Sequence, residues 1–201
     1  MSRTAMTTTV GQPPVDLVAL VHGLGERGLT LACAESLTAG RVAAAVADVP
    51  GASAVLQGGV VAYQNRVKQE VLGVDAGLLE TRGAVDPETA RQMASGVRHA
   101  VGADIGVATT GVAGPEPHQG KAVGTVWLGL AVGVELAGEV AVVVGEKGEP
   151  QVGGTLTVAR LLALDGDREA IRAQSTRAAL AMVAELLGGA SGAAPEGPCI
   201  R

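Results

Sequence analysis

The feature that most constrains the fold is an alternation of short apolar segments with segments of helical period. Apolar runs at 30–34, 54–63 and 103–110 predict strands, and helices are expected at 15–26, 37–46, 65–72, 86–100 and from Asp167 onward. Residues 123–164 predict two or three more strands with no helix between them. We therefore expect one α/β domain, a three-layer α/β/α sandwich with a mixed sheet.

The two ends of the chain are expected to lie outside this domain. Residues 1–14 are polar and predict a flexible N-terminal segment, and residues 188–201, rich in Gly, Ala, Ser and Pro, predict a disordered tail. The domain is expected to span 15–187. Neither a secretory signal nor an apolar run of the roughly 20 residues needed for a membrane span is present, and two cysteines make no disulfide framework. We expect a cytoplasmic protein with no membrane partner.

Composition and residue spacing argue against several kinds of ligand. A net charge of -5 provides no broad cationic field, and one Trp and one Tyr are too few for base stacking, so no direct nucleic-acid binding is expected. The histidines His22, His99 and His118 lie far apart, without the spacing of metal ligands. No metal site is expected.

Two glycine-rich segments resemble nucleotide-binding motifs without their context. The segment 23–28 reads G-x-G-x-x-G, but the expected helix precedes it and the expected strand follows it, the reverse of a dinucleotide site. The segment 114–121 resembles a P-loop with one residue too many, and Ala122 stands where a hydroxyl residue would bind the metal. Neither motif supports nucleotide binding.

Ser36 stands where a buried strand is expected to turn into a helix. The hydroxyl would be exposed there, and the free amides of the first helical turn could stabilise an oxyanion. A serine at this point can equally be an ordinary helix N-cap. Position alone leaves both interpretations open.

A second strand–helix junction follows at 63–68. Asn65 can cap the expected helix, and Lys68 falls in its first turn, where the positive end of the helix dipole favours a neutral amine. A neutral lysine can act as the base for a serine nucleophile. Tyr63, the only tyrosine, could hydrogen-bond to the serine, the lysine or the leaving group, although a surface lysine and a buried ring remain the simpler interpretations.

A third junction closes the expected strand at 103–110. Thr110 offers a hydroxyl, and Gly111 and Gly114 allow the backbone to approach a substrate closely, although a structural turn would have the same composition. Strand ends at one edge of an α/β sheet are where ligands usually bind. The three junctions are therefore expected to face one crevice.

The chain resembles a known family over about residues 15–187, the C-terminal domain of CinA-type proteins, whose members include nicotinamide mononucleotide amidases. The resemblance is carried by A-E-S-L-T-A-G (34–40), D-V-P-G-A-S (48–53), G-G-V-V-A-Y-Q-N-R-V-K (58–68), G-A-V-D-P-E-T-A (83–90), T-T-G-V-A-G-P (109–115), V-G-T-V (123–126) and G-D-R (166–168). The order and spacing of these motifs are far more specific than any one of them.

The resemblance implies deamidation of nicotinamide mononucleotide to nicotinate mononucleotide and ammonia. By motif position it marks Ser36 as the nucleophile, Lys68 as the base, and Tyr63 and Thr110 as supporting groups. Candidates for substrate binding are Glu35, Thr38, Asn65, Gly111, Gly114 and, for the phosphate, Arg168. The resemblance further implies a homodimer that needs neither cofactor nor metal.

The sequence departs from the family pattern beside the proposed nucleophile. Relatives commonly read A-E-S-C-T-G-G, whereas this chain has Leu37 and Ala39 in place of the cysteine and the first glycine. The methyl group of Ala39 could narrow the approach of the substrate. Two alternatives to the proposed reaction stay open at this point: a non-catalytic regulatory or binding module of the competence-damage type, and a serine amidase for another small carboxamide.

Overall fold

The computed structural model describes residues 15–136, 149–151 and 154–188, and its centre is one mixed sheet of six strands. The strands, in the spatial order β2-β1-β3-β4-β6-β5, are β2 (Leu56–Val61), β1 (Leu31–Glu35), β3 (Ile105–Gly111), β4 (Thr125–Gly133), β6 (Thr155–Ala163) and β5 (Glu149–Gln151). β1 runs parallel to β2 and β3, and every pairing beyond β3 is antiparallel. The expected mixed α/β sheet is confirmed.

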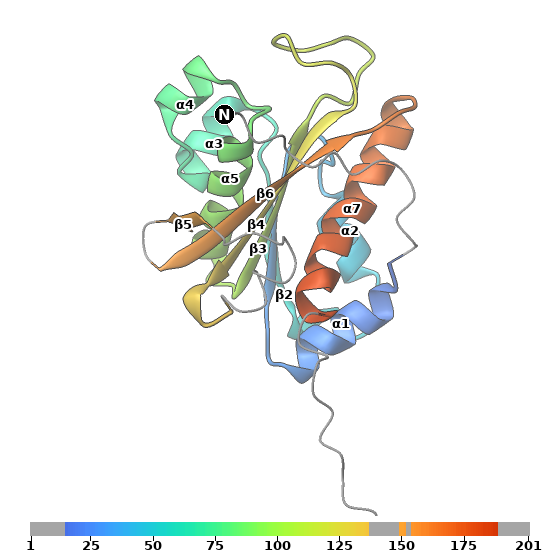
Figure 1. Cartoon of the computed structure of the whole chain (residues 1–201). Helices are drawn as coiled ribbons and strands as arrows, with labels where there is room; N and C mark the ends of the chain where they lie inside the picture. The colour runs from blue at the N-terminus through green and yellow to red at the C-terminus, as the bar shows by residue number, and fades with distance from the viewer. Residues whose placement is uncertain (1–14, 137–148, 152–153, 189–201) are drawn as a thin grey trace, which may run out of the picture.

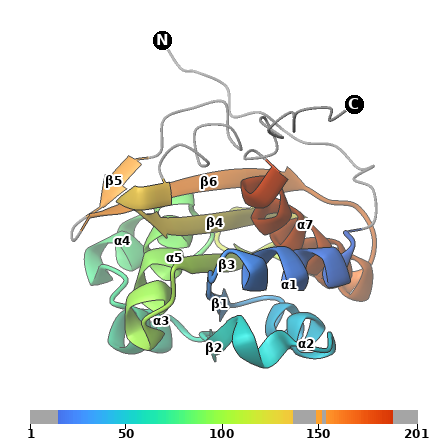
Figure 2. The same cartoon turned by 90° about the horizontal axis from the view of Figure 1, so that it is seen from below.

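Helices cover both faces of the sheet, so the molecule has three layers (Figures 1 and 2). One face carries α1 (Leu17–Glu26), α2 (Arg41–Ala47) and α7 (Arg168–Gly188), and the other carries α3 (Asn65–Leu72), α4 (Ala76–Thr81) and α5 (Pro87–Val101). Short 3-10 helices lie at Ala52–Ala54 and Val134–Leu136. As expected, the side chain of Asp86 caps α5 with Pro87 as its first residue, and Asp167 accepts a hydrogen bond from the Ala170 amide at the start of α7.

The two faces of the sheet pack against their helices at different distances. Toward α7 the strands present large side chains such as Leu31 and Ile105, whereas toward α5 they present alanines such as Ala32 and Ala108. A Cβ atom at Gly129 of β4 would overlap the carbonyl oxygen of Ala90 in α5. The α5 backbone therefore lies directly on the sheet, and glycine is required there for steric reasons.

Several expected boundaries are wrong. α2 begins at Arg41 and not at 37, because Ala39 and Gly40 both have positive φ and form a turn after β1. The strand expected at 54–63 is shorter, since a 3-10 helix occupies Ala52–Ala54. Asn65 does not cap α3: it is the first helical residue and follows the N-cap Gln64. α4 was not expected at all.

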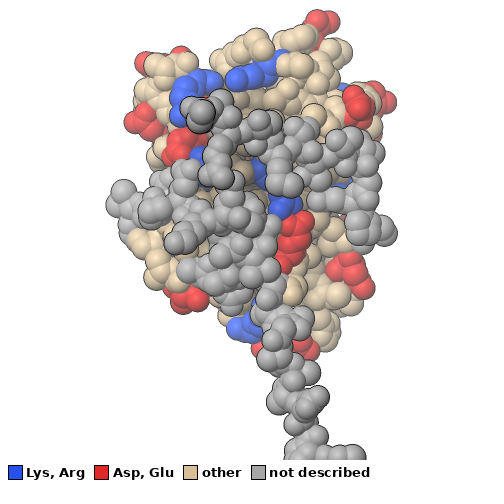
Figure 3. Space-filling model, viewed as in Figure 1, with Lys and Arg blue, Asp and Glu red and all other residues tan. Residues whose placement is uncertain are grey.

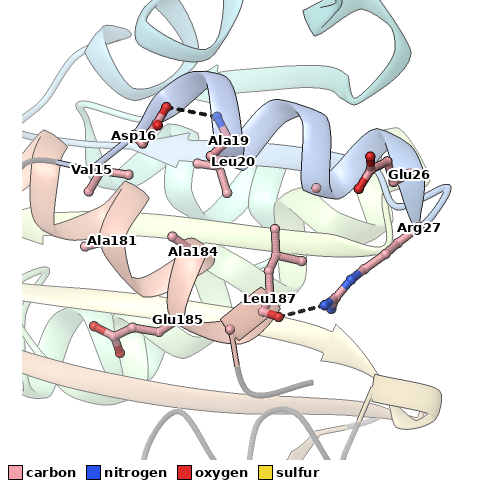
Figure 4. A pocket seen from close by; sticks show the side chains of 12 residues that line it. Val15, Asp16, Ala19, Leu20, Glu26, Arg27, Ala181, Ala184, Glu185 and Leu187 are labelled. Atoms are coloured by element: carbon pink, nitrogen blue, oxygen red, sulfur yellow. Dashed lines mark hydrogen bonds between the residues drawn. The ribbon is translucent and has the colours of Figure 1, made fainter. Parts of the chain in front are cut away.

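The described part of the chain begins and ends beside a groove between α1 and α7 (Figure 4). Leu20, Ala184 and Leu187 line this groove of about 520 Å³, and Arg27 closes one end by donating a hydrogen bond to the Leu187 carbonyl, at 2.7 Å. The expected flexible segment 1–14 and most of the expected tail 188–201 lie outside the described residues. No helix in the described ranges is long and apolar enough to cross a membrane.

Candidate functional site

The carboxyl ends of β1, β2 and β3 meet at one edge of the sheet, and a pocket of about 590 Å³ opens there. Its walls come from the segment after β1, the start of α3, the segment before α5, the loop after β3 and the start of α7. The residues that line it include Ser36, Leu37, Tyr63, Asn65, Lys68, Thr110, Gly111, Gly114 and Arg168. The three junctions expected to share one crevice therefore do so.

Ser36 and Lys68 come together in this pocket. The Lys68 Nζ atom lies 3.2 Å from the Ser36 Oγ atom, and it also donates to the carbonyl oxygens of Ala62 at 2.7 Å and Tyr63 at 3.2 Å. The lysine side chain is 1% exposed, and Ser36 is half-buried. Ser36 directly follows β1, and Lys68 lies in the first turn of α3, which follows the neighbouring parallel strand β2, so residues far apart in sequence meet at one edge of the sheet.

Burial lowers the pKa of Lys68 from its ordinary value of 10.5 to about 8. As an ammonium, the lysine has three protons for three acceptors: two carbonyls and Ser36 Oγ. After losing one proton, the amine can keep both carbonyl hydrogen bonds and turn its lone pair toward the serine hydroxyl. The arrangement therefore suits a base that accepts a proton from Ser36.

Tyr63 lies at the mouth of the pocket. Its ring is 51% exposed, and its hydroxyl oxygen accepts a hydrogen bond of 2.8 Å from Arg168. Arg168 also donates to the Gly114 carbonyl at 2.7 Å, so α7 is tied to both β2's end and the loop after β3. The tyrosine hydroxyl contacts the arginine and neither Ser36 nor Lys68 in this arrangement.

The remaining expected pocket residues divide into two groups. Thr110, Gly111 and Asn65 line the pocket, and the Thr110 hydroxyl donates to the Ala84 carbonyl at 2.7 Å. Asn65 is exposed, and its side chain makes no hydrogen bond to another described residue. Thr38 is fully buried and does not line the pocket: its hydroxyl lies 2.7 Å from the Thr109 hydroxyl.

Glu35, expected to bind substrate, has a different role in the structure. Its buried carboxylate accepts hydrogen bonds from the amides of Gly40, Val42 and Ala43, at 2.8, 3.1 and 2.9 Å. Because these amides form the first turn of α2, Glu35 is the capping group of that helix. It does not line the pocket.

This capping also corrects the expected source of oxyanion stabilisation. The first-turn amides of α2 are engaged by Glu35 and stand several residues beyond Ser36, so they are not available to a substrate. Ser36 itself is not an N-cap, and its amide donates to the Thr109 carbonyl. Leu37, which lines the pocket next to Ser36, has an amide with no acceptor among the described residues.

Sequence reasoning missed several residues around the pocket. Arg172 on α7 donates to the carbonyl oxygens of Leu37 and Thr38, and its position four residues after Arg168, on the same helix face, was a signal that could have found it. Glu116, His118 and Gln119 line the outer wall. Their exposed loop carries no periodic pattern, so they could not be placed in the pocket from local patterning.

Other reactive groups are separated from this pocket. Cys33 lies fully buried in β1, and burial, with a smaller effect of the Glu35 charge, raises the pKa of its thiol. No group of three His, Cys, Asp or Glu side chains among the described residues could hold a metal ion. On the face shown in Figure 3, acidic and basic side chains of the described part are interspersed, with no continuous basic area.

Fold and pocket together define the class: an α/β protein whose mixed sheet holds a serine–lysine pair at one edge. The sequence pattern of the CinA C-terminal domain matches residues 17–149. The chain therefore belongs to the CinA C-terminal domain family, which confirms the resemblance. Arg168 and Arg172 lie beyond the matched range.

Relatives of known sequence and structure support this assignment. A CinA-like protein from Frankia casuarinae is 44% identical over 190 residues, which cover 94% of this chain but only 39% of that protein. The competence damage-inducible protein A (ComA) from Klebsiella pneumoniae subsp. pneumoniae shares the fold with a TM-score of 0.72 and 32% identity, over 86% of this chain and 96% of that one. A CinA superfamily protein from Klebsiella pneumoniae 700603 shares the fold with a TM-score of 0.71 and 31% identity, over 86% of this chain and 95% of that one.

Proposed function

We propose that this chain is an amidohydrolase that converts nicotinamide mononucleotide to nicotinate mononucleotide and ammonia through a serine ester. The observation that carries the proposal is the contact of the buried Lys68 amine with the Ser36 hydroxyl, at 3.2 Å, inside a pocket of about 590 Å³. A pocket of that volume accommodates a mononucleotide-sized ligand. A lysine with a pKa near 8 supplies the base that a serine nucleophile requires.

In the proposed reaction, neutral Lys68 accepts the Ser36 proton while Oγ attacks the carboxamide carbon. The tetrahedral intermediate then expels its amino group, which takes a proton from the Lys68 ammonium and leaves as ammonia. Lys68 next accepts a proton from water, the resulting hydroxide attacks the ester, and Ser36 leaves as it regains its proton from Lys68; the carboxylic acid product then releases its own proton to solvent and departs as the carboxylate. Lys68 ends each half-reaction neutral, so protons balance.

The mouth of the pocket suits the phosphate of such a substrate. Arg168 uses two N–H groups on Tyr63 and Gly114, and a guanidinium has five, so three remain for an anion. Its side chain is exposed at the pocket mouth, opposite the buried lysine. We propose that the phosphate binds there, while the carboxamide reaches Ser36. The expected homodimer and cytoplasmic location remain predictions.

The decisive experiment measures ammonia release from nicotinamide mononucleotide. We expect Ser36→Ala to abolish release, while the control Ser53→Ala, at an exposed position away from the pocket, retains the wild-type rate. Circular dichroism and thermal unfolding show whether the variants fold alike. Full activity in Ser36→Ala would remove Ser36 as nucleophile. Inactivity of the wild-type protein would instead favour a binding module or another carboxamide substrate.

A further inference from the structure

The turn 36–40, which carries the proposed nucleophile, is held by groups from three other elements. Glu35 caps the helix that follows it, Thr38 contacts Thr109 of β3, and Arg172 of α7 contacts its backbone. The first two contacts lie within or beside the sheet. Arg172 is different because it reaches the turn from the helical layer, at a sequence distance of more than 130 residues.

The guanidinium of Arg172 is devoted to backbone carbonyls. Its Nε atom donates to the Leu37 carbonyl at 2.9 Å, and a terminal nitrogen donates to the Thr38 carbonyl at 3.0 Å. Within the described ranges, no carboxylate forms an ion pair with this half-buried side chain. A planar fork holding two successive carbonyls fixes the orientation of two successive peptide units.

The orientation of a carbonyl determines that of the amide in the same peptide unit. In a trans peptide the C=O and N–H groups point in opposite directions. Because Arg172 holds the carbonyls of Leu37 and Thr38, it fixes the peptide units that carry the amides of Thr38 and Ala39. The pocket is lined from both helical layers, by Arg168 of α7 as well as by the start of α3 and the segment before α5.

Three amides in the middle of this turn are also unoccupied. The N–H groups of Leu37, Thr38 and Ala39 donate to no acceptor in the part of the chain that the structure describes. Leu37 lines the pocket directly beside Ser36. Amides fixed in advance near a serine nucleophile are the donors that stabilise a tetrahedral oxyanion.

We propose that Arg172 is a positioning residue that holds the turn 36–40 from the α7 side and so keeps the free Leu37 amide in place beside Ser36, where it is available to the oxyanion. This inference rests on the proposed serine chemistry. Without the guanidinium, the Leu37 carbonyl loses its partner and the Thr38 carbonyl keeps only the Arg41 amide, at 3.4 Å, so both peptide units are held less firmly. Arg172 itself touches no reacting atom, so its loss lowers the stability of the transition state and leaves substrate binding intact.

The test compares Arg172→Met and Arg172→Lys with Arg177→Met, which removes the same charge from an exposed position of the same helix. The oxyanion probe is pyridine-3-boronic acid, whose boron forms a tetrahedral adduct with a serine Oγ at the place of the carboxamide carbon. The ground-state probe is nicotinate mononucleotide. Turnover of nicotinamide mononucleotide gives kcat and KM, and thermal unfolding establishes that each variant is folded at the assay temperature.

We expect Arg172→Met to lower kcat by roughly ten- to a hundredfold, less than the hundred- to thousandfold typical of deleting an oxyanion donor outright. KM and the affinity for nicotinate mononucleotide stay within about twofold, and boronate affinity falls in proportion to kcat. The midpoint of the pH profile, set by Lys68, does not move. Arg172→Lys recovers only part of kcat: the ammonium can still donate to a carbonyl, but it lacks the planar fork that holds two carbonyls at once. Arg177→Met behaves as wild type.

Two outcomes overturn the inference: an unchanged kcat in folded Arg172→Met, or equal losses of boronate and product affinity, which indicate a general structural role. A different result would contradict the proposed substrate. If the wild type binds the boronate through Ser36 but releases no ammonia from nicotinamide mononucleotide, the substrate assignment fails. The boronate comparison then still decides whether Arg172 positions the turn.

Discussion

Lys68 makes the proposed reaction strongly dependent on pH. With a pKa of about 8, roughly one tenth of the lysine is neutral at pH 7 and about nine tenths at pH 9. Only the neutral amine can accept the Ser36 proton, so kcat should rise about tenfold across this interval and then level off. The assay is initial-rate ammonia release under saturating substrate, in buffers of matched ionic strength.

The same pKa shift predicts how stability changes with pH. An unfolded lysine titrates near 10.5, so between pH 8 and 10.5 the unfolded chain binds more protons at this position than the folded one. The free energy of unfolding therefore rises with pH in that window. A shift of this size corresponds to about 3 kcal/mol, which is absent below pH 8 and fully present above 10.5.

Lys68→Met isolates both effects, because methionine is unbranched and does not titrate. The variant should release no ammonia. In denaturant unfolding, the wild type should gain about 3 kcal/mol from pH 8 to 10.5 through Lys68, and the variant should lack this gain. Arg66→Met, which removes an exposed charge from the same helix, serves as control. A flat kcat profile between pH 7 and 9, or an unchanged stability difference, would refute the assignment of a depressed pKa to this buried amine.

Three further substitutions test particular features of the site and the packing. Ala39→Gly should raise the free energy of unfolding by about 1 kcal/mol in urea titration, since Ala39 has a φ of 51°; a loss of stability would contradict the left-handed turn. Gly129→Ala should destabilise by about 2 kcal/mol or more, because the new methyl group overlaps the Ala90 carbonyl; a thermal midpoint equal to wild type would show that α5 packs less closely. Arg168→Met should raise KM roughly ten- to a hundredfold with kcat nearly kept, as expected for one lost charge-assisted contact to the phosphate; an unchanged KM would place the phosphate elsewhere.

The sequence predicted the location of the site better than the physical basis of its properties. The alternation of strand and helix patterns placed Ser36, Lys68 and Thr110 at three junctions where strands end, and parallel strands bring such junctions to one edge, as observed. A depressed pKa at Lys68 was expected from the helix dipole, whereas its cause in the structure is burial. Burial depends on residues distant in sequence, so local pattern could not reveal it.

The capping of α2 shows a second limit of local reasoning. Ser36 follows a strand and precedes a helical pattern, which is what an N-cap does, and the pattern offered no reason to start the helix at Arg41. The actual cap is a carboxylate from Glu35, the last residue of β1, reaching over the turn. Contacts of this kind are set by the path of the turn, and that path depends on the positive φ values of Ala39 and Gly40.

The two departures from the family pattern, Leu37 and Ala39, differ in their effect on the turn after β1. Leu37 is 4% exposed, and its side chain packs into the core on the α7 side. Ala39 takes a conformation suited to glycine, and the strain of roughly 1 kcal/mol falls in the turn that holds Ser36. The Glu35 carboxylate and the Arg172 guanidinium hold that turn from opposite ends. Because both contacts involve backbone groups of the turn, they do not depend on the side chains at 37 and 39.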